Sequence, residues 1–224
     1  SGVHVEKTKE FLLMSLLALH CKLPAIITNQ RNSHWEQLFT PRIGGKTLTI
    51  IGLGAMGKAA VHVGRKLGLK LRGVSASGMP TAGISEVYKP SQLKIALRSA
   101  DFVVVAAPLT PETRNLLDAQ ALSAMKAGAG LINIGRAGVI DIDVVIKRLR
   151  TGQLSGAILD VHAPEPLPKD SPVWTTPNLI VVPHVSSDDA HNYMIQTMEF
   201  SLRNLQRLRA GRKPLNRVQP ILGY

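Results

Sequence analysis

Gly52-Leu-Gly-Ala-Met-Gly57 is the stretch that decides the fold of this 224-residue chain. It stands between the apolar run 46–51, which has strand character, and the amphipathic run 58–67, which has helix character. A GxGxxG pattern in a strand–turn–helix setting is typical of dinucleotide-binding sheets. The first glycine permits a tight turn, the second lets a pyrophosphate approach the backbone, and the third lets the helix pack on the strand. The free amides at the helix start would hold the diphosphate. The alternative is a glycine turn in another α/β protein.

Strand-like and helix-like segments alternate along the rest of the chain. Most of the strand-like segments are short Val, Ile, Leu and Ala runs, as in parallel strands covered on both faces; they are 46–51, 70–75, 102–106, 129–134, 156–160 and 178–182. Helix patterns lie at 4–23, 56–67, 91–98, 118–126, 142–151 and 189–210. Six strands with crossover helices predict an α/β fold, a doubly wound parallel sheet of the Rossmann type.

The predicted domain organisation is a single dinucleotide-binding domain over residues 1–224. It divides into a leading helical segment at 1–45, a Rossmann core at 46–188 and a C-terminal helix and tail at 189–224. The ligand site is expected at the carboxyl ends of the strands, as in other open α/β sheets.

Composition and charge narrow the function classes. The single cysteine, Cys21, excludes an intrachain disulfide and a Cys-based zinc site, so we expect no metal and a cytoplasmic location. The apolar run 11–20 is too short to cross a bilayer, so no membrane association is expected. The net charge is +12, but the basic residues are dispersed and aromatic residues make up only 4% of the chain. Nucleic-acid binding is therefore not expected, and a positive potential that attracts an anionic cofactor and substrate is the better interpretation.

Five motifs follow one another along the chain. They are Gly45 through Gly57, Ala107-Pro-Leu-Thr-Pro-Glu-Thr-Arg114, Asn133-Ile-Gly-Arg-Ala-Gly138, Asp160-Val-His-Ala-Pro-Glu-Pro-Leu-Pro168, and Pro177-Asn178 through Pro183-His184. They cover roughly residues 45–190, and five ordered motifs are far more specific than the glycine loop alone. In this order they resemble the motifs of the D-2-hydroxyacid dehydrogenase family, in particular glyoxylate/hydroxypyruvate reductases.

The resemblance implies an NAD(P)-dependent oxidoreductase with a catalytic triad of Arg136, Glu165 and His184. The substrate would be a small 2-oxo or 2-hydroxy acid such as glyoxylate or hydroxypyruvate. Arg136 would hold its carboxylate and polarise the ketone. His184 would be the general acid in reduction and the general base in oxidation, oriented by Glu165. The alternatives are a strand-capping arginine, a solvated turn glutamate between two prolines, and a core histidine.

The same resemblance implies a cofactor site whose residues are Gly52, Gly54, Ala55, Met56, Gly57, Ser75, Pro108, Thr113, Ile134, Arg136, Asp160 and His184. The cofactor is NADP or NAD. Ser75 stands where NAD-preferring members have a carboxylate for the ribose, so nothing there repels a 2′-phosphate, and NADP is favoured. The arginine that usually accompanies the phosphate is absent too, and Arg72 lies inside the strand. His162 stands where the family often has an aromatic residue, which indicates a packing or pocket-lining substitution.

Two further departures from the family limit what the resemblance implies. One is Ser186-Ser187-Asp188-Asp189 after His184, where the family often has small glycine-rich residues; we expect Ser187 or Asp188 to cap the last helix. The other is that the family's substrate domain is largely absent, since only a helical segment precedes Gly45; we expect an excised cofactor domain or a truncation that binds cofactor and can be inactive alone. A cofactor-sensing interaction protein of the corepressor type is the alternative function.

The segment 4–23 is apolar nearly all round, so it must be buried on more than one side. The resemblance implies packing against a partner in a homodimer. Burial beneath the helix at 189–210 is the alternative.

Overall fold

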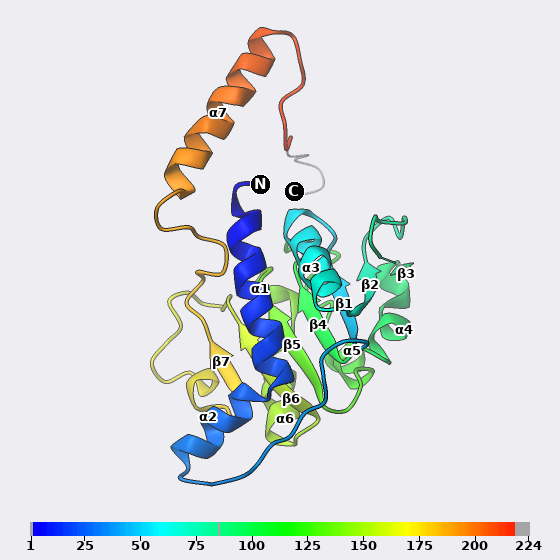
Figure 1. Cartoon of the computed structure of the whole chain (residues 1–224), viewed down its shortest axis with the longest axis vertical. Coiled ribbons are helices and arrows are strands. Elements are labelled where there is room, and N and C mark those ends of the chain that lie inside the picture. The colour runs from blue at the N-terminus through cyan, green and yellow to red at the C-terminus, as the bar shows by residue number, and fades with distance from the viewer. Residues whose placement is uncertain (1, 85, 218–224) are drawn as a thin grey trace.

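A parallel sheet of seven strands forms the centre of the computed structural model, which describes residues 2–84 and 86–217 (Figure 1). The strands are β1 Thr47–Ile51, β2 Lys70–Val74, β3 Glu86–Tyr88, β4 Phe102–Val105, β5 Ala129–Asn133, β6 Leu154–Leu159 and β7 Leu179–Val181. Their order is β3-β2-β1-β4-β5-β6-β7, and each neighbouring pair is parallel. The direction of winding reverses between β1 and β4, so the predicted doubly wound sheet is confirmed.

The helices largely follow the expected periodicity. They are α1 Val5–His20, α2 Leu23–Arg31, α3 Ala55–Lys66, α4 Leu93–Leu97, α5 Ala119–Ser123, α6 Ile142–Arg150 and α7 Tyr193–Arg209. Short 3-10 turns occur at Gly2–His4, Pro90–Gln92, Ala137–Val139 and Pro172–Thr175. The leading helix stops earlier than predicted, because Lys22 takes a left-handed conformation and Pro24 then opens α2.

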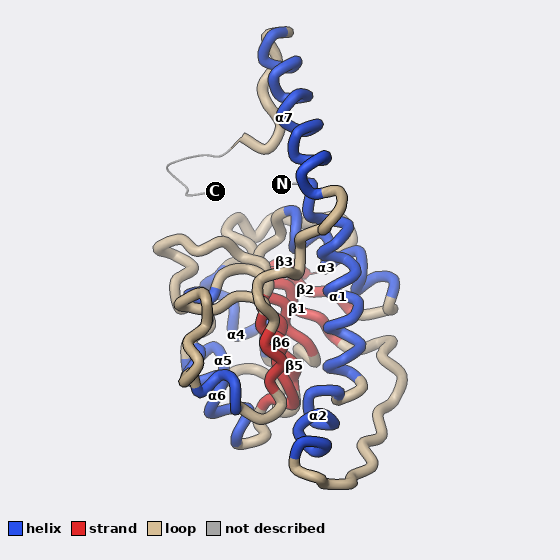
Figure 2. The backbone as a smooth tube through the Cα atoms, turned by 90° about the vertical axis from the view of Figure 1, so that its left-hand side faces the viewer, coloured by secondary structure: helices blue, strands red, loops and turns tan. Residues whose placement is uncertain are grey.

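Helices lie on both faces of the sheet (Figure 2), and each face has its own apolar core. Leu48 and Ile50 of β1 join the core beneath α1 and α3, whereas Ile51 joins the core beneath α4, α5 and α6. This alternation follows from the two-residue period of a strand. Both faces are buried, so only the strand ends are left to form a site.

Helix α1 lies on the sheet beside α3, with Leu12 and Leu16 fully buried in that core. Its opposite side exposes Leu13, Met14 and Leu17. Helix α7 does not cover this side, because it projects away from the body of the molecule and none of its residues is buried (Figure 1). The predicted alternative, burial of the leading helix beneath the C-terminal helix, is therefore wrong, and α1 covers the sheet instead.

Among the described residues, no single helix is long and apolar enough to cross a bilayer, although Gly2–His20 and Leu23–Arg31 together have the length and composition of a span, as a pair bent by 64°.

Candidate active site

The glycine loop between β1 and α3 is held in place by two residues that tolerate no side chain. Gly52 has φ +91°, and a Cβ there would lie 2.7 Å from the Cα of Ala107. A Cβ on Gly57 would lie 1.9 Å from the carbonyl oxygen of Gly52. The first glycine therefore makes the turn and the third allows α3 to approach β1, as the sequence predicted.

Gly54 differs from these two glycines because the space beside it is open. It is the N-cap of α3 with φ −69°, and a Cβ built on it meets no atom within 4 Å. No side chain of the described residues caps the helix, so its first amides, those of Ala55, Met56 and Gly57, have neither a side-chain cap nor an intrahelical acceptor there. An uncapped helix start with free space in front of it fits an anionic group such as a diphosphate.

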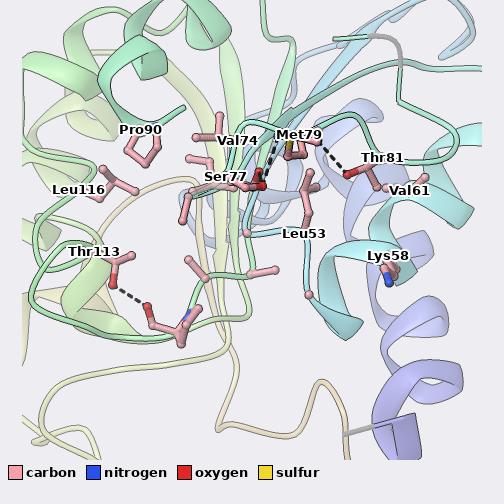
Figure 3. Close-up of a pocket in the computed structure, with 18 of the residues that line it drawn as sticks. Leu53, Lys58, Val61, Val74, Ser77, Met79, Thr81, Pro90, Thr113 and Leu116 are labelled. Carbon is pink, nitrogen blue, oxygen red and sulfur yellow. Dashed lines mark hydrogen bonds between the residues drawn. The ribbon is translucent and has the colours of Figure 1, made fainter. Parts of the chain in front are cut away.

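An open cleft of about 1790 Å³ lies at the carboxyl edge of the sheet in front of this loop (Figure 3). Its walls come from 51–54, the outer side of α3, the segment after β2 and the segment after β4. Five of the residues predicted to bind cofactor line it: Gly52, Gly54, Ser75, Pro108 and Thr113.

The sequence reasoning missed the basic side of the cleft. Lys58, His62, Arg65 and Lys66 of α3 line it. Their spacing places them on the solvent side of an amphipathic helix, a signal that is present in the sequence but that also describes an ordinary solvated face.

The turn after β2 is a network of hydroxyl groups with no carboxylate. The Ser75 hydroxyl accepts a hydrogen bond of 3.2 Å from the Gly78 amide, and the Ser77 hydroxyl accepts one of 3.2 Å from the Met79 amide. The neighbouring cation on the strand, Arg72, is engaged elsewhere, since its Nε lies 3.0 Å from the Glu86 Oε2.

A second cation lies beside this turn. Val74 of β2 pairs with Tyr88 of β3, so Lys89 comes level with Ser75 at the same edge of the sheet. A Cβ on Gly78 would meet the Lys89 Cγ at 2.7 Å, which places the lysine stem against the turn. The short strand β3 was not predicted, and neither was this lysine.

Four other predicted cofactor residues are not among those that line the cleft: Ala55, Met56, Gly57 and Ile134. Ala55, Met56 and Gly57 form the first turn of α3, and the Met56 sulfur lies 3.1 Å from the Thr8 hydroxyl of α1. Ile134 is buried in the core beneath α1 and α3.

The predicted triad comes from the ends of three adjacent strands. Arg136 follows β5, Glu165 lies in the loop after β6, and His184 follows β7. The His184 Nδ1 donates a hydrogen bond of 2.8 Å to the Glu165 Oε2. This bond, followed by one from the His162 amide, lowers the pKa of Glu165 below its ordinary value and keeps the carboxylate charged. The bond also fixes the histidine tautomer and leaves Nε2 for a substrate.

His184 has φ +57°, a left-handed conformation that is uncommon outside glycine. Asp160 stabilises the backbone directly after it, because its Oδ1 accepts hydrogen bonds from the amides of Val185 at 2.8 Å and Ser186 at 3.1 Å. Asp160 is only 1% exposed. The structure thus gives this predicted cofactor residue a contact that the sequence did not indicate.

Arg136 is exposed, and its Nη1 donates to the carbonyl oxygen of Gly135 at 2.7 Å. Within residues 2–84 and 86–217, no hydrogen bond joins it to Glu165 or His184. The turn that carries it is held by Asn133, which is fully buried and donates from Nδ2 to the Arg136 carbonyl at 3.2 Å. The structure brings Glu165 and His184 together, and the exposed Arg136 guanidinium has further N–H donors that could meet a carboxylate.

Comparison with known proteins gives a family match over residues 13–186, to the model described as D-isomer specific 2-hydroxyacid dehydrogenase, NAD binding domain. The glyoxylate reductase of Aeropyrum pernix is 30% identical over 226 residues, covering 97% of this chain and 67% of that protein. Among the curated relatives, the chain spans as little as 32% of one protein's length and as much as 69% of another's.

Two solved structures are similar over nearly the whole chain. The D-isomer specific 2-hydroxyacid dehydrogenase of Xanthobacter autotrophicus Py2, in complex with NADPH and MES, has a TM-score of 0.88 and 32% identity, covering 99% of this chain and 90% of that one. An NADPH-dependent glyoxylate/hydroxypyruvate reductase of Sinorhizobium meliloti, in complex with NADP and sulfate, has a TM-score of 0.89 and 27% identity, covering 100% and 71%.

Proposed function

The chain belongs to the D-isomer specific 2-hydroxyacid dehydrogenases, whose NAD-binding domain it contains. We propose that it is the cofactor-binding part of an oxidoreductase that interconverts small 2-oxo and 2-hydroxy acids. The observation that carries this proposal is the His184–Glu165 hydrogen bond of 2.8 Å, at the strand ends that also hold the glycine loop. We propose residues 1–224 as one dinucleotide-binding domain, with the substrate held between its strand ends and other parts of the whole protein.

The chain's own residues perform the acid–base and binding steps of this reaction. A bound nicotinamide would supply or accept the hydride. In reduction, the His184 Nε2 would give a proton to the ketone oxygen, and in oxidation it would take one from the hydroxyl group. Glu165 holds the imidazole in the required tautomer and stabilises its charged form. The Arg136 guanidinium binds the substrate carboxylate and polarises the ketone.

We propose NADP as the preferred form of the cofactor. Ser75 and Ser77 offer hydroxyl groups where a carboxylate would repel a phosphate, and Lys89 lies against the same turn. A 2′-phosphate would thus meet donors and a cation. The NADPH and NADP bound to the Xanthobacter and Sinorhizobium proteins support this choice. The diphosphate would lie at the uncapped start of α3, beside Gly54.

We further propose that the protein is a cytoplasmic homodimer. Leu13, Met14 and Leu17 expose an apolar side of α1, and Trp35 and Phe39 on the following segment are 90% and 82% exposed. A second copy of the chain would bury these side chains, since exposed apolar clusters of this kind mark interaction sites. The free thiol of Cys21 is exposed, which suits a reducing compartment.

The test is an assay of the full-length protein with NADPH and NADH against a panel of 2-oxo acids that includes glyoxylate and hydroxypyruvate. The proposal expects cofactor oxidation with at least one acid, faster with NADPH than with NADH. Tight cofactor binding without turnover of any acid contradicts it and favours the cofactor-sensing interaction protein. We propose no nucleic-acid ligand, because the basic residues Lys58, His62, Arg65 and Lys66 line the cleft where the cofactor would bind.

A further inference from the structure

His162 contacts both of the segments that carry the acid–base pair. Its backbone amide donates a hydrogen bond of 2.7 Å to the Glu165 Oε1, the oxygen that His184 does not use. Its ring Nε2 lies 3.0 Å from the carbonyl oxygen of Val182 and donates to it. Val182 is two residues before His184, so one residue links the loop after β6 to the end of β7.

The carbonyl of Val182 needs a side-chain donor because of its place in the sheet. Its amide donates to the Leu159 carbonyl at 2.9 Å, which continues the β6–β7 ladder by one step. The carbonyl of a strand residue points to the same side as its own amide, so the Val182 carbonyl also faces β6, and β6 ends at Leu159 before its ladder supplies a donor. The His162 ring takes the place of that donor.

The two members of the pair are not held by packing alone. The side chains of Glu165 and His184 are 36% and 45% exposed, and the histidine backbone has the unfavourable φ of +57°. A non-glycine residue in such a conformation persists only where its surroundings hold it. Asp160 holds the backbone after His184, and the His162 ring holds the backbone before it.

We propose that His162 is a positioning residue, whose ring nitrogen fixes the segment 182–184 and thereby the orientation of His184 toward Glu165. This inference rests on the proposed function. Two substitutions separate hydrogen bonding by the ring from its packing. A phenylalanine fills similar space but cannot donate a hydrogen bond, whereas a glutamine is smaller and carries an N–H donor. Packing and hydrogen bonding therefore predict opposite orders for the two substitutions.

The experiment compares His162→Phe and His162→Gln in the full-length protein bound to NADPH, with His34→Phe, an exposed histidine away from the site, as the matched control. We expect His162→Phe to lower kcat about tenfold, as a modest part of the 10²–10⁴-fold that acid–base catalysis supplies, with KM and the NADPH Kd within about twofold. His162→Gln should recover most of kcat, and the control should match the wild type.

A second measurement does not depend on turnover. In NMR spectra of protein labelled with ¹⁵N-histidine, the Nδ1–H signal of His184 bonded to Glu165 should broaden or vanish in His162→Phe and persist in His162→Gln. Wild-type kcat and an unchanged His184 signal in His162→Phe would overturn the inference, as would a kcat in His162→Gln no better than in His162→Phe. If no 2-oxo acid is turned over, the proposed function fails, while the His184 signal still decides whether His162 positions the ring.

Discussion

A side chain at Gly54 should remove cofactor binding without unfolding the domain. The residue has φ −69° and ψ −160°, which other residues adopt freely, and a Cβ there meets no atom within 4 Å. In Gly54→Val the new methyl groups enter the open space in front of the helix amides. Gly57→Ala is the matched contrast, because its single methyl would lie 1.9 Å from a backbone carbonyl oxygen that cannot swing aside.

Gly54→Val should weaken cofactor binding, whereas Gly57→Ala should lower the stability of the fold. Keeping a diphosphate from two helix amides removes two charge-assisted hydrogen bonds of about 1.5–3 kcal/mol each, so Gly54→Val should weaken the dinucleotide Kd at least about hundredfold. Its free energy of unfolding should change by less than about 1 kcal/mol, a helix N-cap effect. Gly57→Ala should lose about 1–3 kcal/mol of stability through overpacking.

Calorimetric titration with NADPH and urea denaturation measure the two quantities on the same samples. We expect a folded Gly54→Val protein that no longer binds NADPH, and a Gly57→Ala protein with a lower free energy of unfolding than the wild type. A folded Gly54→Val variant with wild-type affinity would refute the placement of the diphosphate at the start of α3.

Three further predictions concern cofactor choice, assembly and pH. Ser75→Asp should shift the preference from NADP toward NAD, by repelling the 2′-phosphate and bonding the ribose, and competitive titration of both cofactors measures it; an unchanged ratio contradicts the role of this turn. In sedimentation, Met14→Glu should convert the dimer to a folded monomer, whereas Leu16→Glu should unfold the domain because Leu16 is fully buried. If the wild-type protein sediments as a monomer at tens of micromolar, roughly where an obligate interface is saturated, the dimer is ruled out. Hydrogen bonds from the Asn192 side chain and from the amides of Asn192 and His191 lower the pKa of Asp189 from 3.8 to about 2. The stabilisation that these bonds give is therefore complete above pH 3.8 and is lost as pH falls toward 2. The NMR chemical shifts of the His191 and Asn192 amides should change in that pH window, and this change should be absent in Asp189→Asn.

The sheet could be predicted because its strands carry a strong local signal. Most of the predicted strands are short apolar runs, and each predicted strand is present within a few residues of its expected bounds. The strand β3 was missed because it is three residues long, half exposed and partly polar. Its place in the sheet depends on pairing with β2 and on the Arg72–Glu86 ion pair, which are long-range contacts that no local pattern contains.

Much of the candidate site could also be predicted from the sequence, since strand order alone places the three triad segments side by side. The bond between His184 and Glu165 follows from motif order and sheet topology. The contacts that hold His184 and Glu165 in place could not be predicted from the sequence. Asp160 and His162 act on backbone groups more than ten residues away, and any residue with an amide or carbonyl can be such a partner.

The last helix shows the same limit at its start. The sequence favoured Ser187 or Asp188 as the cap of this helix, but the N-cap is Asn192, which makes no side-chain cap bond, and Asp189 binds the amides of His191 and Asn192 just before the helix. Neighbouring serine and aspartate residues are chemically equivalent as caps, so only the path of the backbone decides between them.

The most direct test of the proposed activity is the turnover of a 2-oxo acid by the full-length protein with and without His184. The account predicts reduction to the D-2-hydroxy acid with NADPH, and a loss of about 10²–10⁴-fold in kcat for His184→Ala, with the NADPH Kd nearly unchanged. A folded His184→Ala protein that keeps the wild-type rate across roughly pH 5–9, a window around the ordinary histidine pKa, would contradict it.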